Sequence, residues 1–115
     1  MNDDTKAEII LDLCAVLDID STKTEGDDYK LLIAKLNTAI RAIKSARNYP
    51  ASYTPQMIAD DLDNYYANIF DLAIYEYNQS GAEGEIIHNE NGTNRSYKSR
   101  KECFLGVDAF ARNVI

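Results

Sequence analysis

The sequence has no tryptophan, one histidine, two cysteines and two prolines among its 115 residues. Because His88 is the only imidazole, the chain cannot build a metal site from several histidines or pair two histidines in catalysis. Cys14 and Cys103 lack the paired spacing of a zinc site or a disulfide framework, so we expect both to be reduced packing residues. These absences remove the commonest routes to metal chemistry.

Long apolar runs are also missing. The first residues, MNDDTKAEIILDLC, are acidic where a signal peptide is basic, and Asp12 interrupts the apolar run between Ile9 and Leu17. No apolar stretch approaches the roughly 18 residues that span a bilayer. We therefore expect one soluble domain over residues 1–115, without secretion and without a membrane partner.

Charge is sorted along the chain in four blocks of alternating sign. Residues 1–28 carry a net charge of −7 and residues 29–53 one of +5, whereas residues 54–90 carry −8 and residues 91–115 carry +3. Such blocks either pair as solvated helix faces within one molecule or meet between subunits, as in a head-to-tail ring. The sequence leaves both arrangements open.

Apolar spacing predicts a mostly α fold, a small four-helix bundle-like domain. The first helix is expected over residues 4–17, with capping oxygens offered by Asp3, Asp4 and Thr5. The second is expected to begin near Asp27 and to stop at Tyr49 and Pro50, since proline disfavours a helical residue before it. The polar side of this second helix carries Lys30, Arg41 and Lys44.

A long central third helix is predicted to begin at Thr54, as N-cap, with Pro55 in its first turn. Gly81 is expected to cap its C-terminal end. Its acidic side includes Asp60, Asp61 and Asp63. We expect the dipole near the helix start to stabilise these acids, rather than a pair of catalytic carboxylates to form.

The segment after the third helix loses the helical period. Asn91 and Gly92 both tolerate positive φ, and the pair therefore predicts a β-hairpin over residues 85–97, between the third and fourth helices. A fourth helix is expected from about Tyr97 to near the C-terminus, with Cys103, Phe104 and Val107 on its apolar face.

No grouping of residues predicts an enzyme, a metal site or a cofactor. The loop that starts at Asp18 has Lys23 and Tyr29 where a calcium loop requires glycine and glutamate. The bases of the second helix could follow a phosphate backbone, but the acidic blocks on either side and a pI of about 4.6 oppose duplex binding. We therefore expect a role in binding or assembly.

Residues 65–101 and the FLGV run that follows them carry a family resemblance. The run LAIYEYNQSGAEG closes the long helix, HNENGTNRSY follows it, and FLGV marks a short final helix. This order resembles the C-terminal half of the bacteriophage head-tail connector proteins, the adaptors of long non-contractile-tailed phages that infect Gram-positive bacteria. The resemblance covers about half of the chain; the N-terminal half agrees only in its helical layout.

The resemblance implies a virion protein without enzymatic activity, present in the host cytoplasm during assembly. It would form a ring of twelve copies beneath the portal protein, extend the DNA conduit and present a platform for the stopper or another head-completion protein. In such adaptors the C-terminal region commonly docks onto the portal and neighbouring subunits. By that similarity, the partner-binding candidates are Asn91, Gly92, Arg95, Ser96, Tyr97, Lys98 and Arg100.

The same resemblance gives the charge blocks a mechanical interpretation. An acidic lumen would repel phosphates, so DNA would pass through without specific binding. Candidates for the tunnel wall or the subunit interface are Lys30, Arg41, Lys44, Asp60, Asp61 and Asp63, and the loop over residues 48–53 is another. Two alternatives stay open: a small helical protein-interaction or regulatory module, and a helical DNA-binding protein.

Overall fold

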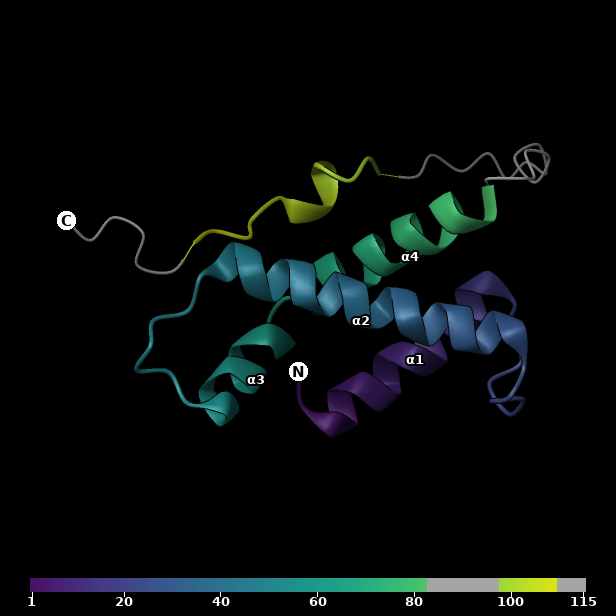
Figure 1. Ribbon diagram of the computed structural model, residues 1–115, viewed down its shortest axis with the longest axis horizontal. Helices are drawn as coiled ribbons and strands as arrows, with labels where there is room; N and C mark the ends of the chain where they lie inside the picture. The colour runs from purple at the N-terminus through teal and green to yellow at the C-terminus, as the bar shows by residue number, and fades with distance from the viewer. Residues whose placement is uncertain (83–97, 110–115) are drawn as a thin grey trace.

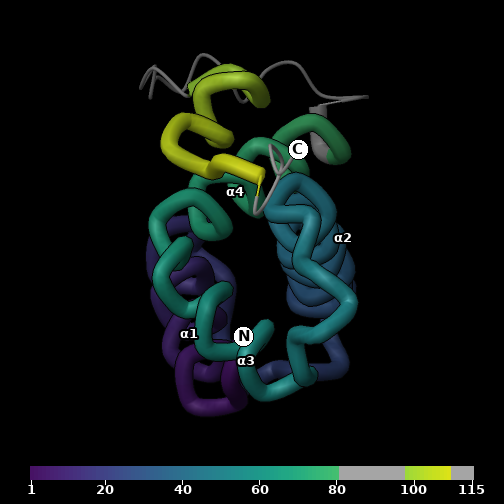
Figure 2. Tube along the Cα trace, turned by 90° about the vertical axis from the view of Figure 1, so that its left-hand side faces the viewer, coloured from purple at the N-terminus to yellow at the C-terminus, as the bar shows by residue number. Residues whose placement is uncertain are grey.

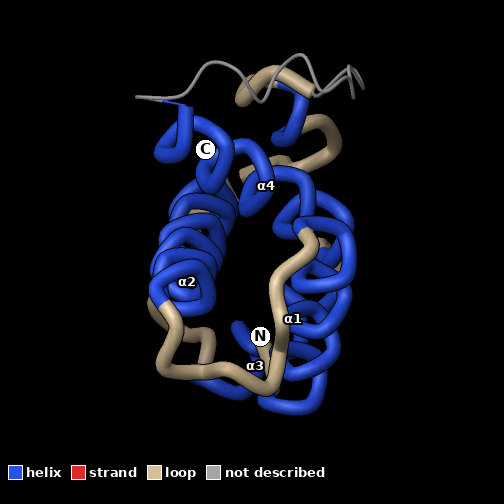
Figure 3. Tube along the Cα trace, turned by 90° about the vertical axis from the view of Figure 1, so that its right-hand side faces the viewer, coloured by secondary structure: helices blue, strands red, loops and turns tan. Residues whose placement is uncertain are grey.

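In the described part of the chain, four α-helices and one short 3₁₀ turn form the fold of the computed structural model (Figure 1). The structure describes residues 1–82 and 98–109. In chain order the elements are α1 (Asp3–Leu17), α2 (Asp27–Arg47), α3 (Pro55–Asp63), α4 (Tyr66–Ala82) and η2 (Glu102–Phe104). Helices and loops alone make up the described residues, as Figure 3 shows. The predicted mostly α fold is confirmed.

α2 and α4 form the centre of the molecule, where they make its most extensive helix contact. α2 begins with Asp27 and Asp28 in its first turn and ends at Asn48, whose φ of 52° leaves the helical region. Both ends agree with the sequence prediction. α1 also packs against α4. In the end view, α1 and α2 lie on opposite sides of the molecule (Figure 2).

The start of α1 differs from the prediction. Its N-cap is Asn2, which makes no side-chain bond to its own helix, and Asp3 and Asp4 occupy the first turn. The Asn2 side chain is instead bonded to α3. The first-turn acids still favour the helix, because negative charge interacts well with the positive end of the dipole.

The predicted long third helix is wrong, because it is broken into α3 and α4. Thr54 caps α3 as expected, and its side chain accepts a hydrogen bond from the Met57 amide at 3.1 Å. At the junction, the Asn64 and Tyr65 amides donate to carbonyls three residues back, at 3.0 and 2.9 Å. These tighter bonds end one helix and start the next through a helical turn, not a hairpin.

The two ends of this split helix also differ from the prediction. α4 continues through Gly81 to Ala82, so Gly81 is not a C-cap. Asp60, Asp61 and Asp63 lie in the last turns of a nine-residue helix rather than near the start of a long one. The dipole is unfavourable to acids at that end, so other groups must stabilise them.

The predicted fourth helix is also wrong within residues 98–109, which contain only the single 3₁₀ turn η2. Ser99 and Glu102 begin it with reciprocal side-chain to backbone bonds at 2.9 and 3.2 Å. The Asn68 side chain of α4 then donates to the carbonyls of Cys103 and Leu105, both at 2.9 Å. Gly106, at a φ of 86°, turns the chain away. The predicted hairpin over residues 85–97 lies outside the described residues.

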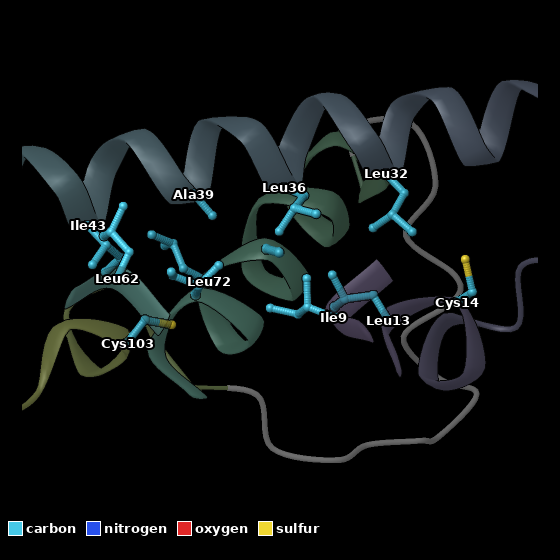
Figure 4. Packing of buried hydrophobic residues seen from close by; sticks show 12 residues of the cluster. Ile9, Leu13, Cys14, Leu32, Leu36, Ala39, Ile43, Leu62, Leu72 and Cys103 are labelled. Atoms are coloured by element: carbon cyan, nitrogen blue, oxygen red, sulfur yellow. The ribbon is translucent and has the colours of Figure 1, made fainter. Parts of the chain in front are cut away.

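The core runs between α2 and the other elements. Figure 4 shows a row of side chains projecting from α2: Leu32, Leu36, Ala39 and Ile43. Their counterparts come from every other element, namely Ile9, Leu13, Cys14, Leu62, Ile69, Leu72, Ala73 and Cys103. Burial raises the pKa of both cysteine thiols, in agreement with the expected packing role.

A matched pair of leucine substitutions tests this core. Leu72→Ala should lower the free energy of unfolding by about 2 to 5 kcal/mol, because a fully buried side chain leaves a cavity. Leu11→Ala, at a side chain that is 57% exposed, should change it by no more than about 0.5 kcal/mol. Urea denaturation measures both, and equal effects would contradict the assigned packing.

Candidate interaction surfaces

The N-terminus is attached to α3 by carboxylates. Asp63 accepts from the Asn2 amide at 3.0 Å, from the Asn2 side chain at 2.7 Å and from the Thr5 hydroxyl at 3.0 Å. Asp60 accepts from the side chains of Asn2 and Gln56 at 2.9 and 2.8 Å. These bonds stabilise acids that the end of α3 disfavours, and they hold the start of α1 in place.

The Asp63 bonds also set its protonation. Burial alone would raise the pKa of this carboxyl, but the hydrogen bonds from Asn2 and Thr5 and the nearby N-terminal amino group together lower it below the ordinary 3.8. Asp63 is therefore charged in the folded protein at neutral pH.

Arg47 joins four parts of the chain at the end of α2. Its guanidinium donates to Asp61 of α3 through two nitrogens, at 2.8 and 3.2 Å, and to the Asp108 carbonyl at 2.7 Å. It also lies 5.0 Å from the ring centre of Tyr65, and the Tyr49 hydroxyl donates to Asp61 at 2.6 Å. Arg47 is only 9% exposed, and the two bonds to one carboxylate fix its geometry.

A groove with exposed cations lies beside this network, with a volume of about 770 Å³. We call it the basic groove; it is lined by Arg41, Lys44, Ser45, Asn48, Tyr49, Pro50, Ala51, Tyr53 and Ile58. The rings of Tyr49 and Tyr53 stack at 5.6 Å. In the described part of the chain, neither Arg41 nor Lys44 has an ion-pair partner. The groove thus combines exposed positive charge with an aromatic wall.

The outward side of α1 has the opposite character. We call it the acidic face; its exposed residues are Asp4, Glu8, Leu11, Asp12 and Ala15. Beside it, α1 and α4 form a shallow apolar groove that includes Val16 and Phe70. The Tyr66 hydroxyl reaches across to Asp12 and donates to it, but Asp4 and Glu8 make no ion pair within residues 1–82 and 98–109.

The basic C-terminal segment covers acids of α4. Lys98 pairs with Asp71 at 2.9 Å, and Arg100 pairs with Glu76 at 3.2 Å. Arg100 also lies 5.2 Å from the ring centre of Phe104. Two of the charge blocks therefore pair within the monomer, which is one of the two arrangements that the sequence leaves open.

The other site candidates fall into different settings. Lys30 makes an exposed ion pair with Glu25 at 3.3 Å, whereas Arg41 and Lys44 line the basic groove. Asp61 is engaged by Arg47, and Asp60 and Asp63 by the N-terminus. The remaining partner-binding candidates, Asn91, Gly92, Arg95, Ser96 and Tyr97, lie outside the described residues and stay predictions.

Sequence reasoning missed Arg47, Tyr49 and Asn68 as organising residues. A signal for Arg47 was present, because it lies four residues after Ile43 and eleven after Leu36, on the apolar side of α2. An arginine at such a position needs a buried partner. Asn68 gave no such signal, since its bonds are to carbonyls 35 and 37 residues later.

The described residues hold no group of three or more histidine, cysteine, aspartate or glutamate side chains that could bind a metal ion. Among these residues, no helix is long and apolar enough to cross a membrane. No family model, curated protein or solved structure matches this chain.

Removing the Arg47 guanidinium tests its organising role. Arg47→Ala should lower the free energy of unfolding by about 3 to 5 kcal/mol, because Asp61 loses its charged partner in a poorly solvated position. Arg100→Ala removes a half-exposed ion pair and should cost no more than about 1 kcal/mol. Urea denaturation compares the two variants; similar losses would contradict the assignment of Arg47 as the organising residue.

Acid titration tests the Asp63 network. A carboxyl whose folded pKa is lowered adds stability above its unfolded pKa of about 3.8 and loses it as the pH falls towards the folded value. Asp63→Asn should therefore be less stable at neutral pH and lose less stability below about pH 4 than the wild type. Thr5→Ala, which removes one of the bonds, should show a smaller change. Unaltered acid dependence in Asp63→Asn would contradict the account.

Proposed function

We propose that the protein is a structural virion component, an adaptor that forms a ring beneath the portal, extends the DNA conduit and joins the capsid to the stopper or tail. The observation that carries this proposal is the order of sequence elements over residues 65–101, which resembles the head-tail connector proteins. Within residues 98–109, Lys98 and Arg100 support it through their position, because both side chains are about half exposed on the outside of α4.

The surfaces suit assembly better than chemistry. The donors of Arg47 bind Asp61 and Asp108 within the monomer, so this cation is a structural tie rather than a group offered to a substrate. Arg41 and Lys44, by contrast, present exposed positive charge next to two stacked tyrosines. Interfaces are enriched in arginine and tyrosine, which makes this groove a suitable contact for another protein.

The net charge also suits a DNA conduit. A chain with a net charge of −7 repels phosphates when many copies surround a duplex. Such repulsion lets DNA slide, since a basic wall would bind it through release of counterions. The charge supports passage of DNA and opposes its specific capture.

A second candidate function is a small protein-interaction module outside a virion. The apolar groove between α1 and α4 favours it, because Val16 is exposed and Tyr66 and Phe70 stack beside it at 6.4 Å. This module would bind a cellular protein without any need for a portal.

Purified protein mixed with DNA-filled capsids tests the proposal. It should sediment with portal-bearing capsids and not with capsids that lack the portal, and electron microscopy should show added density at the portal vertex. Arg95→Ala combined with Tyr97→Ala should weaken this binding by at least about tenfold, since both are candidate contacts. Lys23→Ala, at an exposed lysine of the loop before α2, is the control and should bind normally.

Three outcomes would contradict the adaptor. Equal sedimentation with both kinds of capsid would remove the role of the portal. Capture of a specific cellular protein without capsid binding would favour the interaction module. Salt-sensitive binding of duplex DNA would favour the DNA-binding alternative.

A further inference from the structure

The cations of the basic groove stand one helical turn apart. Arg41 and Lys44 are exposed, and residues three apart on a helix are neighbours on its surface. Going along the chain from Lys44, the groove changes from charged to apolar, because Tyr49, Pro50 and Tyr53 form its next part. The groove thus has a direction along the chain, with two cations first and aromatic rings after them.

The acidic face of α1 has the same order of charged and then apolar side chains, but its charges are negative. Asp4 and Glu8 stand one turn apart, and Leu11 follows on the same side of the helix. Leu11 is 57% exposed, which makes it one of the most exposed large apolar side chains in the described residues. The face therefore presents two acids first and a leucine after them, followed by Asp12, which accepts from the Tyr66 hydroxyl.

These surfaces lie on different sides of the molecule. Both end views show α1 and α2 on opposite sides (Figures 2 and 3). Each helix directs its buried residues into the shared core, and among the described residues no ion pair joins Asp4 or Glu8 to Arg41 or Lys44. One copy therefore does not satisfy its own groove with its own acidic face.

We propose that the acidic face of one copy binds in the basic groove of the next. Asp4 and Glu8 would pair with Arg41 and Lys44, while Leu11 would pack against the tyrosine wall. The contact joins two different surfaces, so it is heterologous and generates a ring when its rotation closes. This contact specifies how copies meet in the proposed adaptor. Its role in a virion rests on the proposed adaptor function.

A second copy of the chain fits the groove better than a nucleic acid. Phosphates could pair with Arg41 and Lys44, but a strand of nucleic acid would leave Leu11 exposed and would give Asp4 and Glu8 no partner. The two surfaces together satisfy both sets of charges and cover the leucine. Charge complementarity of this kind fixes the register of a contact and its choice of partner.

Exchange of the charges tests the contact. In a low-salt buffer, at protein concentrations on the order of 1 mM, the wild type should self-associate, and 1 M salt should weaken this. Asp4→Lys with Glu8→Lys should lower the association constant at least about tenfold, and so should Arg41→Glu with Lys44→Glu. An equal mixture of the two double variants should associate again, because each reversed surface then meets a complementary one.

Matched controls distinguish the effect of the contact residues on association from the effect of a changed net charge. Asp3→Lys with Asp27→Lys changes the charge as much as the acidic-face variant and also lies in first turns of helices, but not on the acidic face. Lys23→Glu with Lys101→Glu is the equivalent control for the groove. Both controls should associate like the wild type, and circular dichroism should show that all four variants stay folded.

Zero-length carbodiimide cross-linking locates the contact directly. In a mixture of ordinary and ¹⁵N-labelled wild-type protein, Lys44 should couple to Asp4 or Glu8 in peptides that contain one labelled and one unlabelled partner. The proposal is overturned if these mixed pairs are absent, or if the mixed charge variants fail to associate. It is also overturned if the groove binds duplex DNA while the wild type stays monomeric.

The outcomes also separate this contact from the adaptor function. If charge exchange restores association but portal-bearing capsids are not bound, the contact stands and the adaptor role fails. If capsids bind wild type and Arg41→Glu with Lys44→Glu equally well, the adaptor role stands and the contact fails.

Discussion

The buried guanidinium of Arg47 is the interaction on which the arrangement of the chain most depends. Through Asp61 and the Asp108 carbonyl it fixes α3 and the C-terminal segment to the end of α2, and the Tyr65 ring lies beside it where α4 is about to begin. Without this tie, α3 would keep the packing of Ile58 and Leu62, the Tyr49 bond to Asp61 and the N-terminal network. The loop beside it would also lose the contact of Arg47 with the Tyr49 ring, whose centre is 5.8 Å away, and the basic groove depends on that loop.

Charge is used in two different ways in this molecule. The acids of α3 and α4 are satisfied inside the monomer by the N-terminus, Arg47 and the segment that contains Lys98 and Arg100. The acids of α1 and the bases Arg41 and Lys44 of α2 remain exposed. The proposed head-to-tail contact accounts for this second set, so the alternating blocks of the sequence serve both the fold and the assembly.

Local signals predicted local structure well. The ends of α2 and the start of α3 follow from Asp27, Pro50 and the Thr54 cap, each of which acts within a few residues. The break at Asn64 could not be foreseen, because apolar residues continue across it with helical spacing. Within residues 98–109, the backbone found in place of the predicted helix is held by Asn68, a contact far away in sequence. Of the candidate site, the cations and the loop over residues 48–53 were proposed from sequence, but the stacking of Tyr49 on Tyr53 required the tertiary structure.

A reconstruction of portal-bearing capsids with the protein added tests the central claim most directly. The account predicts a ring beneath the portal in which α1 of each copy lies against Arg41 and Lys44 of its neighbour, with Leu11 next to the tyrosine wall. A portal vertex without added density would contradict the adaptor function. A ring in which the acidic face and the basic groove both point to solvent would contradict the way its copies are proposed to meet.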